Sequence, residues 1–339
     1  MTDIHNKEAN IGENKLVNPS YVVTGKELYE MDIKEMPWLI EGVFGRSGLC
    51  ALGGSSDMGK STFLRQLAIS VAMGDSTFLE WKLNLRHKKV LYISTEDEPI
   101  SIAHVIRKQF SNSITAEKLE NIFFIFGQEN LLDNINELLV KHDFDIIIVD
   151  AFSDVFIGDM NNISQVRTCL NKYNTIANNN DVLILFLHHT GKRTESLTPS
   201  KSSFIGSQGF EAKMRMVAQL TKDPFDIDAR HFCIVKGNFI SEENKNKSFK
   251  LNFKDLIFSN TNERVPFGKL AINPNAEILK EEIQDRVCDL SAEGNSIRQI
   301  EDIMKSEGYK IGKTKVSDLK KECPDCDNTK ASSDAPVLT

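Results

Sequence analysis

The chain has 339 residues, enough for one large α/β domain of roughly 250 residues and a smaller module. Its composition, 40% apolar and 26% charged with a net charge of -7, is typical of a soluble globular protein. It excludes a generally basic nucleic-acid binder, so any contact with nucleic acid must come from a local patch. No apolar run reaches the length of a membrane span, and residues 1–20 lack a signal-peptide core. We therefore expect a cytoplasmic protein without a membrane partner.

The predicted elements alternate between strand and helix in the first two thirds of the chain. Continuous apolar stretches predict strands at 48–53, 89–95, 121–126, 145–150 and 182–187, and amphipathic stretches predict helices at 60–73, 99–111, 131–142 and 163–178. This alternation is typical of a parallel sheet covered on both faces. Shorter strands at 214–220, 230–236 and 248–258 favour an antiparallel extension. We predict an α/β domain at 21–265, preceded by disordered residues 1–20.

The stretch at 54–62 lies between the first strand and the first long helix. It fits the phosphate-binding pattern G-x-x-x-x-G-K-[ST]. A strand, a glycine turn and a helix start direct backbone N–H groups toward one point, where the helix N-terminus adds partial positive charge. Lys60 would reach the outer phosphates of a nucleotide, and the Ser61 hydroxyl would bind Mg²⁺. The residues predicted to bind the nucleotide here are Gly54, Ser55, Ser56, Asp57, Met58, Gly59, Lys60, Ser61 and Thr62.

Two acidic positions at strand ends are candidates for the chemistry. Asp150 ends an apolar strand and would hold Mg²⁺ through a water molecule; the alternative is a helix cap for the residues that follow. Glu96 follows the second strand, which we expect beside the strand of the phosphate loop. A carboxylate there can polarise a water molecule for attack on the outermost phosphate. Asp97 and Glu98 are alternatives, although acidic residues in a first helical turn also simply favour the helix dipole.

His188 and His189 end the fifth strand. One of them could contact the γ-phosphate and couple its loss to the next loop, while the other packs inside, since alternation turns one inward and one outward. No other group with metal spacing accompanies them, so we do not expect zinc. Cys323 and Cys326 form a single C-x-x-C, which we interpret as two reduced thiols in a frayed tail.

Residues 190–209 form a long irregular segment, which within a compact domain is usually functional or mobile. Beyond it, Arg215 and Lys236 lie near the ends of late strands. ATPases that form rings place such cations against a neighbour's nucleotide, where they stabilise charge in the transition state. Arg193 and Arg230 are alternatives for this role.

The C-terminal stretch, 276–323, changes character. Helices are predicted at 276–292, 296–307 and 313–322, with Ser296 at a cap position. The short spacing resembles a helix-turn-helix, which would contact duplex DNA, but a docking or oligomerisation module fits as well. Residues 324–339 are expected to be disordered.

A family resemblance rests on several of these motifs. They are the stretch 38–42, the loop 54–62, residues 92–97, residues 148–150, residues 187–192, Gly206-Ser207 leading into Arg215, and residues 235–238. In these the chain resembles the RecA-type ring ATPases of the AAA_25 group, which include RepA-like hexameric replicative helicases, over about residues 22–258. The resemblance implies a RecA-like P-loop domain with a mainly parallel sheet extended by antiparallel strands, followed here by the small helical module.

The resemblance also implies roles for single residues. Lys60 and Ser61 would bind ATP and Mg²⁺, Glu96 would be the catalytic base, and Asp150 the second acidic residue. His189 would sense the γ-phosphate, and Arg215 would be an arginine finger supplied in trans, with Lys236 also at the nucleotide. Segment 190–209 would face the central channel of a ring. The residues expected to meet a DNA backbone there are Lys192, Arg193 and Lys201, and Phe204 is the one aromatic residue that could serve as a stacking platform.

These features lead to one main hypothesis, a Mg-ATP-hydrolysing homohexamer that acts on single-stranded DNA as the replicative helicase of a plasmid, phage or other mobile element. Its partners would include replication or mobile-element proteins. The alternative hypothesis is a nucleotide-switched DNA-binding regulator, or a recombination or repair accessory ATPase, without unwinding activity.

Overall fold

The computed structural model of the chain describes residues 22–110, 116–191, 194, 197–271, 274–309 and 311–323. The predictions of disorder for 1–20 and 324–339 lie outside these residues. The chain divides into two compact units, within 1–271 and 272–339, and each is described by itself. No helix in the described part is both long and apolar enough to cross a membrane.

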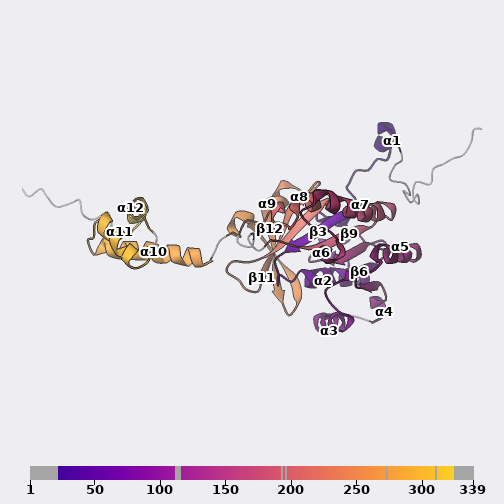
Figure 1. Cartoon of the computed structure of the whole chain (residues 1–339), viewed down its shortest axis with the longest axis horizontal. Helices are drawn as coiled ribbons and strands as arrows, with labels where there is room; N and C mark the ends of the chain where they lie inside the picture. The colour runs from indigo at the N-terminus through magenta and orange to yellow at the C-terminus, as the bar shows by residue number, and fades with distance from the viewer. Residues whose placement is uncertain are drawn as a thin grey trace, which may run out of the picture. The chain divides into compact units, whose positions relative to one another are not determined.

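A nine-stranded sheet organises the first unit (Figure 1). Its strand order is β13-β12-β11-β10-β3-β9-β8-β6-β7. The six strands from β10 to β7 are parallel, and β11, β12 and β13 extend the sheet with antiparallel pairing. This mixed, mainly parallel α/β sheet confirms the predicted fold class. The strands are β3 (Gly48–Gly54), β6 (Val90–Ser94), β7 (Ile122–Phe126), β8 (Ile146–Asp150), β9 (Leu183–His189), β10 (Met216–Lys222), β11 (Ala229–Gly237), β12 (Lys247–Lys254) and β13 (Ile257–Pro266).

Two predictions about the strands were wrong. The single strand expected at 248–258 is the hairpin of β12 and β13, because Asp255 and Leu256 turn the chain with positive φ angles of 52° and 63°. No glycine, proline or asparagine signals this turn in the sequence. Strand β6 is also not beside β3, since β9 and β8 lie between them.

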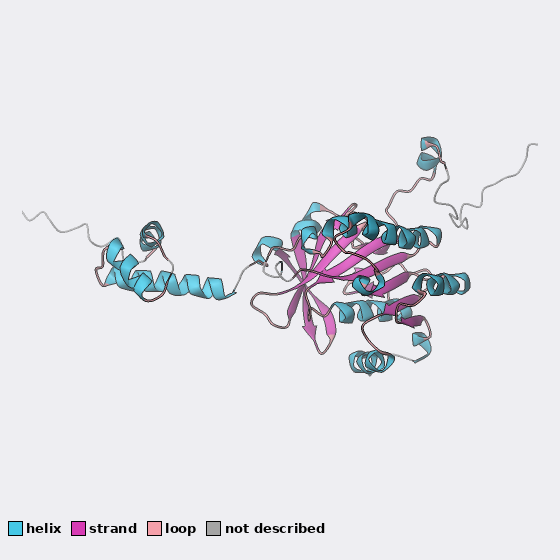
Figure 2. Ribbon diagram, viewed as in Figure 1, coloured by secondary structure: helices cyan, strands magenta, loops and turns pink. Residues whose placement is uncertain are grey.

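Helices cover both faces of the sheet (Figure 2). Helix α2 packs on one face, together with apolar residues of α3 and α4. Helices α5, α6, α7 and α8 contribute to the core on the other face. The strands are apolar on both sides because both faces are buried, as expected for a parallel sheet. The helices are α1 (Gly25–Glu30), α2 (Lys60–Met73), α3 (Pro99–Phe110), α4 (Ala116–Leu119), α5 (Leu131–Lys141), α6 (Phe152–Val155), α7 (Ile163–Asn179), α8 (Ser207–Glu211) and α9 (Glu242–Asn246).

Short elements surround this core. Leu39 and Ile40 of β1 are fully buried, so the stretch before the first core strand packs against the domain. The remaining short elements are β1 (Trp38–Ile40), β2 (Phe44–Gly45), β4 (Thr77–Phe78), β5 (Trp81–Lys82), and the 3₁₀ turns Lys201–Ser203 and Phe267–Lys269.

The second unit contains α10 (Pro274–Ala292), α11 (Ile297–Ser306) and α12 (Lys313–Lys321). Ser296 and Gln299 form a reciprocal capping box that begins α11. A small core includes Val287, Ile300 and Met304. Here Cys323 is not a thiol in a frayed tail, as we predicted, but a buried residue in a disulfide with Cys288. Spacing along the sequence did not reveal this pairing because α10 and the end of α12 meet only through tertiary packing. Cys326 lies outside the described residues.

Candidate active site

The phosphate loop joins β3 to α2 at the carboxyl edge of the parallel strands. Gly54 has a φ of +156°, and a Cβ there would lie 2.6 Å from the Leu220 carbonyl oxygen on β10. Gly59 precedes α2 with a φ of +84°, where a Cβ would press on Phe253 and Phe258 at 3.0 Å. Both glycines are therefore required by backbone conformation and by close neighbours. The strand, turn and helix start occur where the sequence pattern predicts them.

Lys60 is buried, and its side chain folds back along the loop. Its Nζ donates to the Ser55 carbonyl oxygen at 2.6 Å. Burial lowers the pKa of Lys60, while the nearby carboxylates of Asp150, Glu96 and Asp57 oppose that effect. These carboxylates show that strand ends far apart in sequence converge on the lysine.

Asp150 ends β8 and is 5% exposed. Its Oδ2 accepts a hydrogen bond of 2.6 Å from the Tyr92 hydroxyl, and its Oδ1 is buried without a partner among the described residues. Burial raises the pKa of Asp150, whereas the Tyr92 and Ser61 hydroxyls lower it. A buried carboxylate oxygen without a donor is energetically costly in a bare protein.

This orphaned oxygen fits a Mg²⁺ site. The Ser61 hydroxyl lies near the same carboxylate, and a hydroxyl together with a carboxylate is a donor set that suits Mg²⁺. Ser61 and Asp150 are thus the residues that would hold a Mg²⁺ ion or its bound water. A separate cluster of three or more His, Cys, Asp or Glu side chains able to hold a metal was not found in the described ranges.

Glu96 and His189 meet beside the loop although their strands are not neighbours. The His189 Nε2 lies 3.6 Å from the Glu96 Oε1, and both side chains are partly exposed. His189 pairs with Gly54 across β9 and β3, which brings it directly to the phosphate loop. The backbone N–H of Thr95, the residue before Glu96, donates to the Asp150 carbonyl oxygen at 2.9 Å. The structure thus gathers Glu96, His189, Lys60 and Asp150 at one edge of the sheet.

The alternatives to Glu96 point elsewhere. Asp97 forms an ion pair of 3.2 Å with the buried Arg65 of α2, and Glu98 is exposed at the start of α3.

The adjacent histidine, His188, faces the interior. It is 1% exposed, packs on the Phe210 ring at 4.3 Å between centroids, and has its Nε2 2.9 Å from the Ile205 carbonyl oxygen. Burial lowers its pKa to about 4. His188 is therefore neutral at physiological pH and ties β9 to the segment that follows it.

Segment 190–209 is folded against the phosphate loop in its described parts. Thr190 forms a β-bridge with Phe204, and its hydroxyl lies 3.4 Å from the Ser55 hydroxyl. Phe204 is 3% exposed and lies on the backbone of Gly53. Phe204 is thus buried and does not serve as the stacking platform that we considered.

The basic residues of this segment fall into two groups. Lys201 is 55% exposed at its side chain, with Glu211 4.0 Å away. Lys192 and Arg193 lie outside the described residues.

Arg215 and Lys236 lie at the opposite edge of the sheet. The Arg215 N–H donates to the Leu49 carbonyl oxygen at 2.8 Å, at the beginning of β3, whereas the phosphate loop follows its end. A strand of this length separates the two edges by about 20 Å. Lys236 pairs with Val217 at the same edge and forms an ion pair of 3.2 Å with Glu211. The structure therefore does not bring either cation to the phosphate loop of its own chain.

Arg230 lies at the carboxyl edge but is turned away from solvent. It is 7% exposed, donates to the carbonyl oxygens of Ile227 and Ala229, and lies over the Phe253 ring. These contacts make it part of the wall beside the phosphate loop.

Sequence reasoning missed two polar residues of the site. Tyr92 holds Asp150, and Arg65 holds Asp97. The available signals were a hydroxyl inside an apolar strand and a cation on a helix face that is otherwise buried.

The fold and these residues define a nucleotide-binding domain of the RecA-like P-loop class. A solved structure with the same fold is the ATPase domain of a replicative helicase, with a TM-score of 0.52 and 15% identity over 69% of this chain and 95% of that one. A family model described as an AAA domain, AAA_25, matches residues 19–195. This match covers more than half of the chain, and the protein belongs to this family of RecA-type ATPases.

Curated relatives resemble part of the chain. DNA repair protein RadA from Campylobacter jejuni is 31% identical over 147 residues, and RadA from Rickettsia conorii is 30% identical over 146 residues. The alignments cover 41% and 42% of this chain but 28% and 29% of the relatives. The chain thus spans less than a third of the length of these relatives.

Proposed function

We propose that the protein is a Mg²⁺-dependent ATPase that acts on single-stranded DNA as a homo-oligomeric ring, a hexamer by family resemblance, and serves as the replicative helicase of a plasmid, phage or other mobile element. The observation that carries this proposal is the division of the predicted catalytic groups between opposite edges of one sheet. Lys60, Glu96 and His189 are at the carboxyl edge, whereas Arg215 is at the start of β3. A second copy of the chain can supply the missing cation.

Each group has a role that its surroundings support. Lys60 lies along the loop and would neutralise charge on the outer phosphates. Glu96, partly exposed, would accept a proton from the attacking water molecule, and His189 would donate to the γ-phosphate. When bound between Ser61 and Asp150, Mg²⁺ supplies charge neutralisation at the phosphate oxygens. Arg215, and Lys236 beside it, would stabilise the transition state from the neighbouring subunit.

A subunit-mixing experiment tests this arrangement. Lys60→Ala and Arg215→Ala should each abolish DNA-stimulated ATP hydrolysis when assayed alone, whereas Arg167→Ala, an exposed arginine on α7, should not. In an equal mixture of the two inactive variants, about a quarter of the interfaces pair an intact loop with an intact Arg215 if subunits assort at random. Activity should therefore return to about that fraction. A mixture as inactive as its components would refute the trans role of Arg215.

The DNA repair relatives favour a second candidate, a repair or recombination ATPase that does not unwind DNA. A forked duplex with a labelled strand separates the two candidates. Strand release that requires ATP and disappears in Lys60→Ala supports the helicase. DNA-stimulated hydrolysis without strand release, over a range of salt concentrations, supports the repair ATPase.

The helical unit at 274–323 could contribute duplex-DNA or partner contacts of its own. Truncation at about residue 270 should leave ATP-driven activity on single strands largely intact if the first unit does the work. Loss of all DNA binding in the truncated protein would instead favour a regulator in which this module makes the contact.

A further inference from the structure

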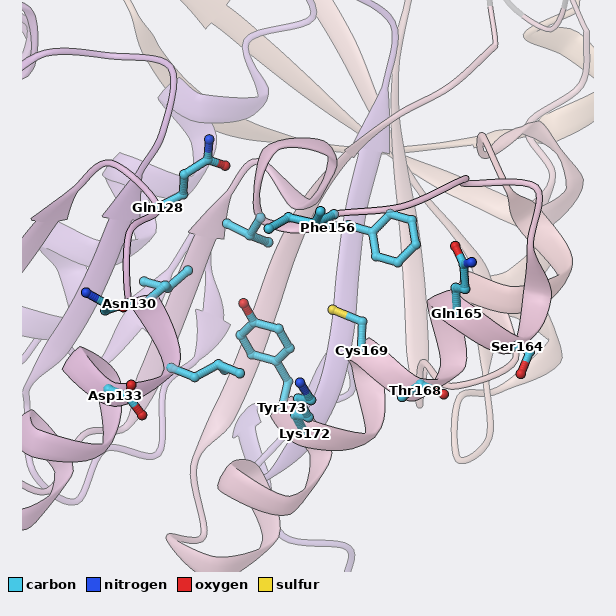
Figure 3. Close-up of a pocket in the computed structure, with 14 residues that line it drawn as sticks. Gln128, Asn130, Asp133, Phe156, Ser164, Gln165, Thr168, Cys169, Lys172 and Tyr173 are labelled. Carbon is cyan, nitrogen blue, oxygen red and sulfur yellow. The ribbon is translucent and has the colours of Figure 1, made fainter.

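A cavity that the proposed chemistry does not use lies between α5, α7 and the connection after α6 (Figure 3). Its volume is about 590 Å³, within the range of small-molecule sites. It opens near the carboxyl ends of β7 and β8, on the sheet face opposite α2. At such strand ends, α/β proteins commonly bind ligands.

The lining combines a flat apolar part with a polar rim. Leu131, Val155 and Phe156 provide the apolar part. Gln128 and Asn130 provide amides whose side chains form no hydrogen bond with any described residue, and Asn130 does not use its side chain to cap α5. The ligand should therefore have apolar faces and edges that carry both donors and acceptors.

Tyr173 supplies the strongest indication that the cavity is a built site. The residue is 2% exposed and its ring packs edge-on against Phe186, yet its hydroxyl has no hydrogen-bond partner in the part of the chain that the structure describes. Figure 3 shows this hydroxyl directed toward the side of the cavity where Gln128 and Phe156 lie. A buried hydroxyl without a partner is costly, so a ligand atom that accepts or donates there would gain a hydrogen bond.

The charges of the lining point to the neutral part of a ligand. Lys172 and Asp133 contribute one cation and one anion, so the cavity carries no net charge that would attract a phosphate. Flat rings with hydrogen-bonding edges are the features of a nucleobase, which stacks on an aromatic side chain and pairs with amides through its edge.

The position of the cavity connects it to both the nucleotide site and the predicted DNA segment. Its wall at Val155 and Phe156 follows Asp150 by only a few residues, and the Thr95 hydroxyl, next to Glu96, lies 2.6 Å from Asp154 Oδ2 on α6. On the other side, a Cβ on Gly206 would lie 2.4 Å from the Met160 carbonyl oxygen, so the end of segment 190–209 touches the connection that lines the cavity.

We propose that this cavity binds one unstacked base of the single-stranded DNA on which the protein acts. The inference rests on the proposed function, because the DNA backbone along segment 190–209 is what would bring the base to the cavity. The base stacks on Phe156, and its edge is contacted by Gln128 and by the Tyr173 hydroxyl. Through α6 and Thr95, occupancy of the cavity is linked to the segment that carries Glu96.

Oligonucleotides with and without bases test the proposal. Full-length protein with a non-hydrolysable ATP analogue is titrated with labelled oligo(dT) and oligo(dA), and with an abasic strand of equal length that has the same phosphates. The wild type should bind at least one base-bearing strand more than about tenfold tighter than the abasic strand. Gln128→Ala and Tyr173→Phe should each reduce this preference about three- to tenfold. Asn171→Ala, on an exposed position of the same helix, should retain it.

The outcomes separate the two proposals. If no strand binds, the proposed action on DNA fails, and the base site fails with it. If the abasic strand binds as tightly as oligo(dT) and oligo(dA), the protein still binds DNA but the base site is refuted. If the wild type prefers bases and both variants keep that preference, bases are contacted elsewhere and the cavity has another occupant.

Cys169 offers a direct probe of occupancy. It lines the cavity and is half-buried, whereas the other two described free cysteines, Cys50 and Cys233, are fully buried. Alkylation at Cys169, followed by peptide mass spectrometry, should slow at least threefold in the presence of the preferred base-bearing strand and be unaffected by the abasic strand. Equal alkylation rates with both strands would contradict a base in the cavity.

Discussion

Tyr92→Phe provides a sharp test of how the metal-binding carboxylate is held. The change removes one hydroxyl and keeps the ring, which packs against Phe124 at 5.5 Å between centroids. The hydroxyl donates at 2.6 Å to Asp150, and both residues are almost fully buried. A hydrogen bond to a buried charged group contributes about 1.5–3 kcal/mol. We therefore expect the free energy of unfolding to fall by about 2 kcal/mol, and the melting temperature by about 4–8 °C in a domain of this size.

The same change should weaken metal binding. Residues that orient a metal ligand typically alter affinity by about 10- to 100-fold. Mn²⁺ bound in the presence of ADP, measured by electron paramagnetic resonance, should therefore show at least tenfold lower affinity in Tyr92→Phe. Tyr29→Phe is a matched control because Tyr29 is 87% exposed, and neither quantity should change in it. A lower melting temperature with unchanged Mn²⁺ affinity would show that Tyr92 is structural and does not position Asp150.

Two further predictions concern a buried imidazole and the second unit. The unfolded His188 side chain takes up a proton near pH 6.5 but the folded one only near pH 4, so stability is lost as pH falls through this window, by up to about 3 kcal/mol; urea unfolding at pH 7.5 and 4.5 should show a smaller loss in His188→Gln, and an equal loss would contradict the assignment. Closing a loop with a sequence separation of 35 residues stabilises by about 3–4 kcal/mol, so Cys288→Ser should speed hydrogen exchange in α10 and α12 while leaving the first unit unchanged, and unaltered exchange would refute this.

The parts of the site that could be predicted from the sequence are those with local causes. The phosphate loop depends on a strand, two glycines and a helix within one short stretch, and these residues form that structure here. Asp150 stands out because it ends an apolar run. The alternation of His188 and His189 also follows from strand geometry alone.

The remainder depends on tertiary contacts. Arg215 lies at the far edge of the sheet because β10 pairs in parallel with β3, a choice that no nearby residue signals. Tyr92 and Arg65 acquire their roles only when β6, β8 and α2 come together. The order of strands in the sheet, with β9 and β8 between β3 and β6, likewise follows from crossovers and not from adjacency in sequence.

The bridge between Thr190 and Phe204 has a mechanical consequence. Both ends of the intervening segment are fixed at the phosphate loop, one through the Ser55 hydroxyl and the other through the Phe204 ring on Gly53. The segment therefore acts as a handle whose base, and not its tip, belongs to the nucleotide site. A pull on the handle is delivered to the residues that surround the phosphates, and a shift of those residues moves the handle in turn, so the length of the segment can change without altering the point at which force enters the sheet.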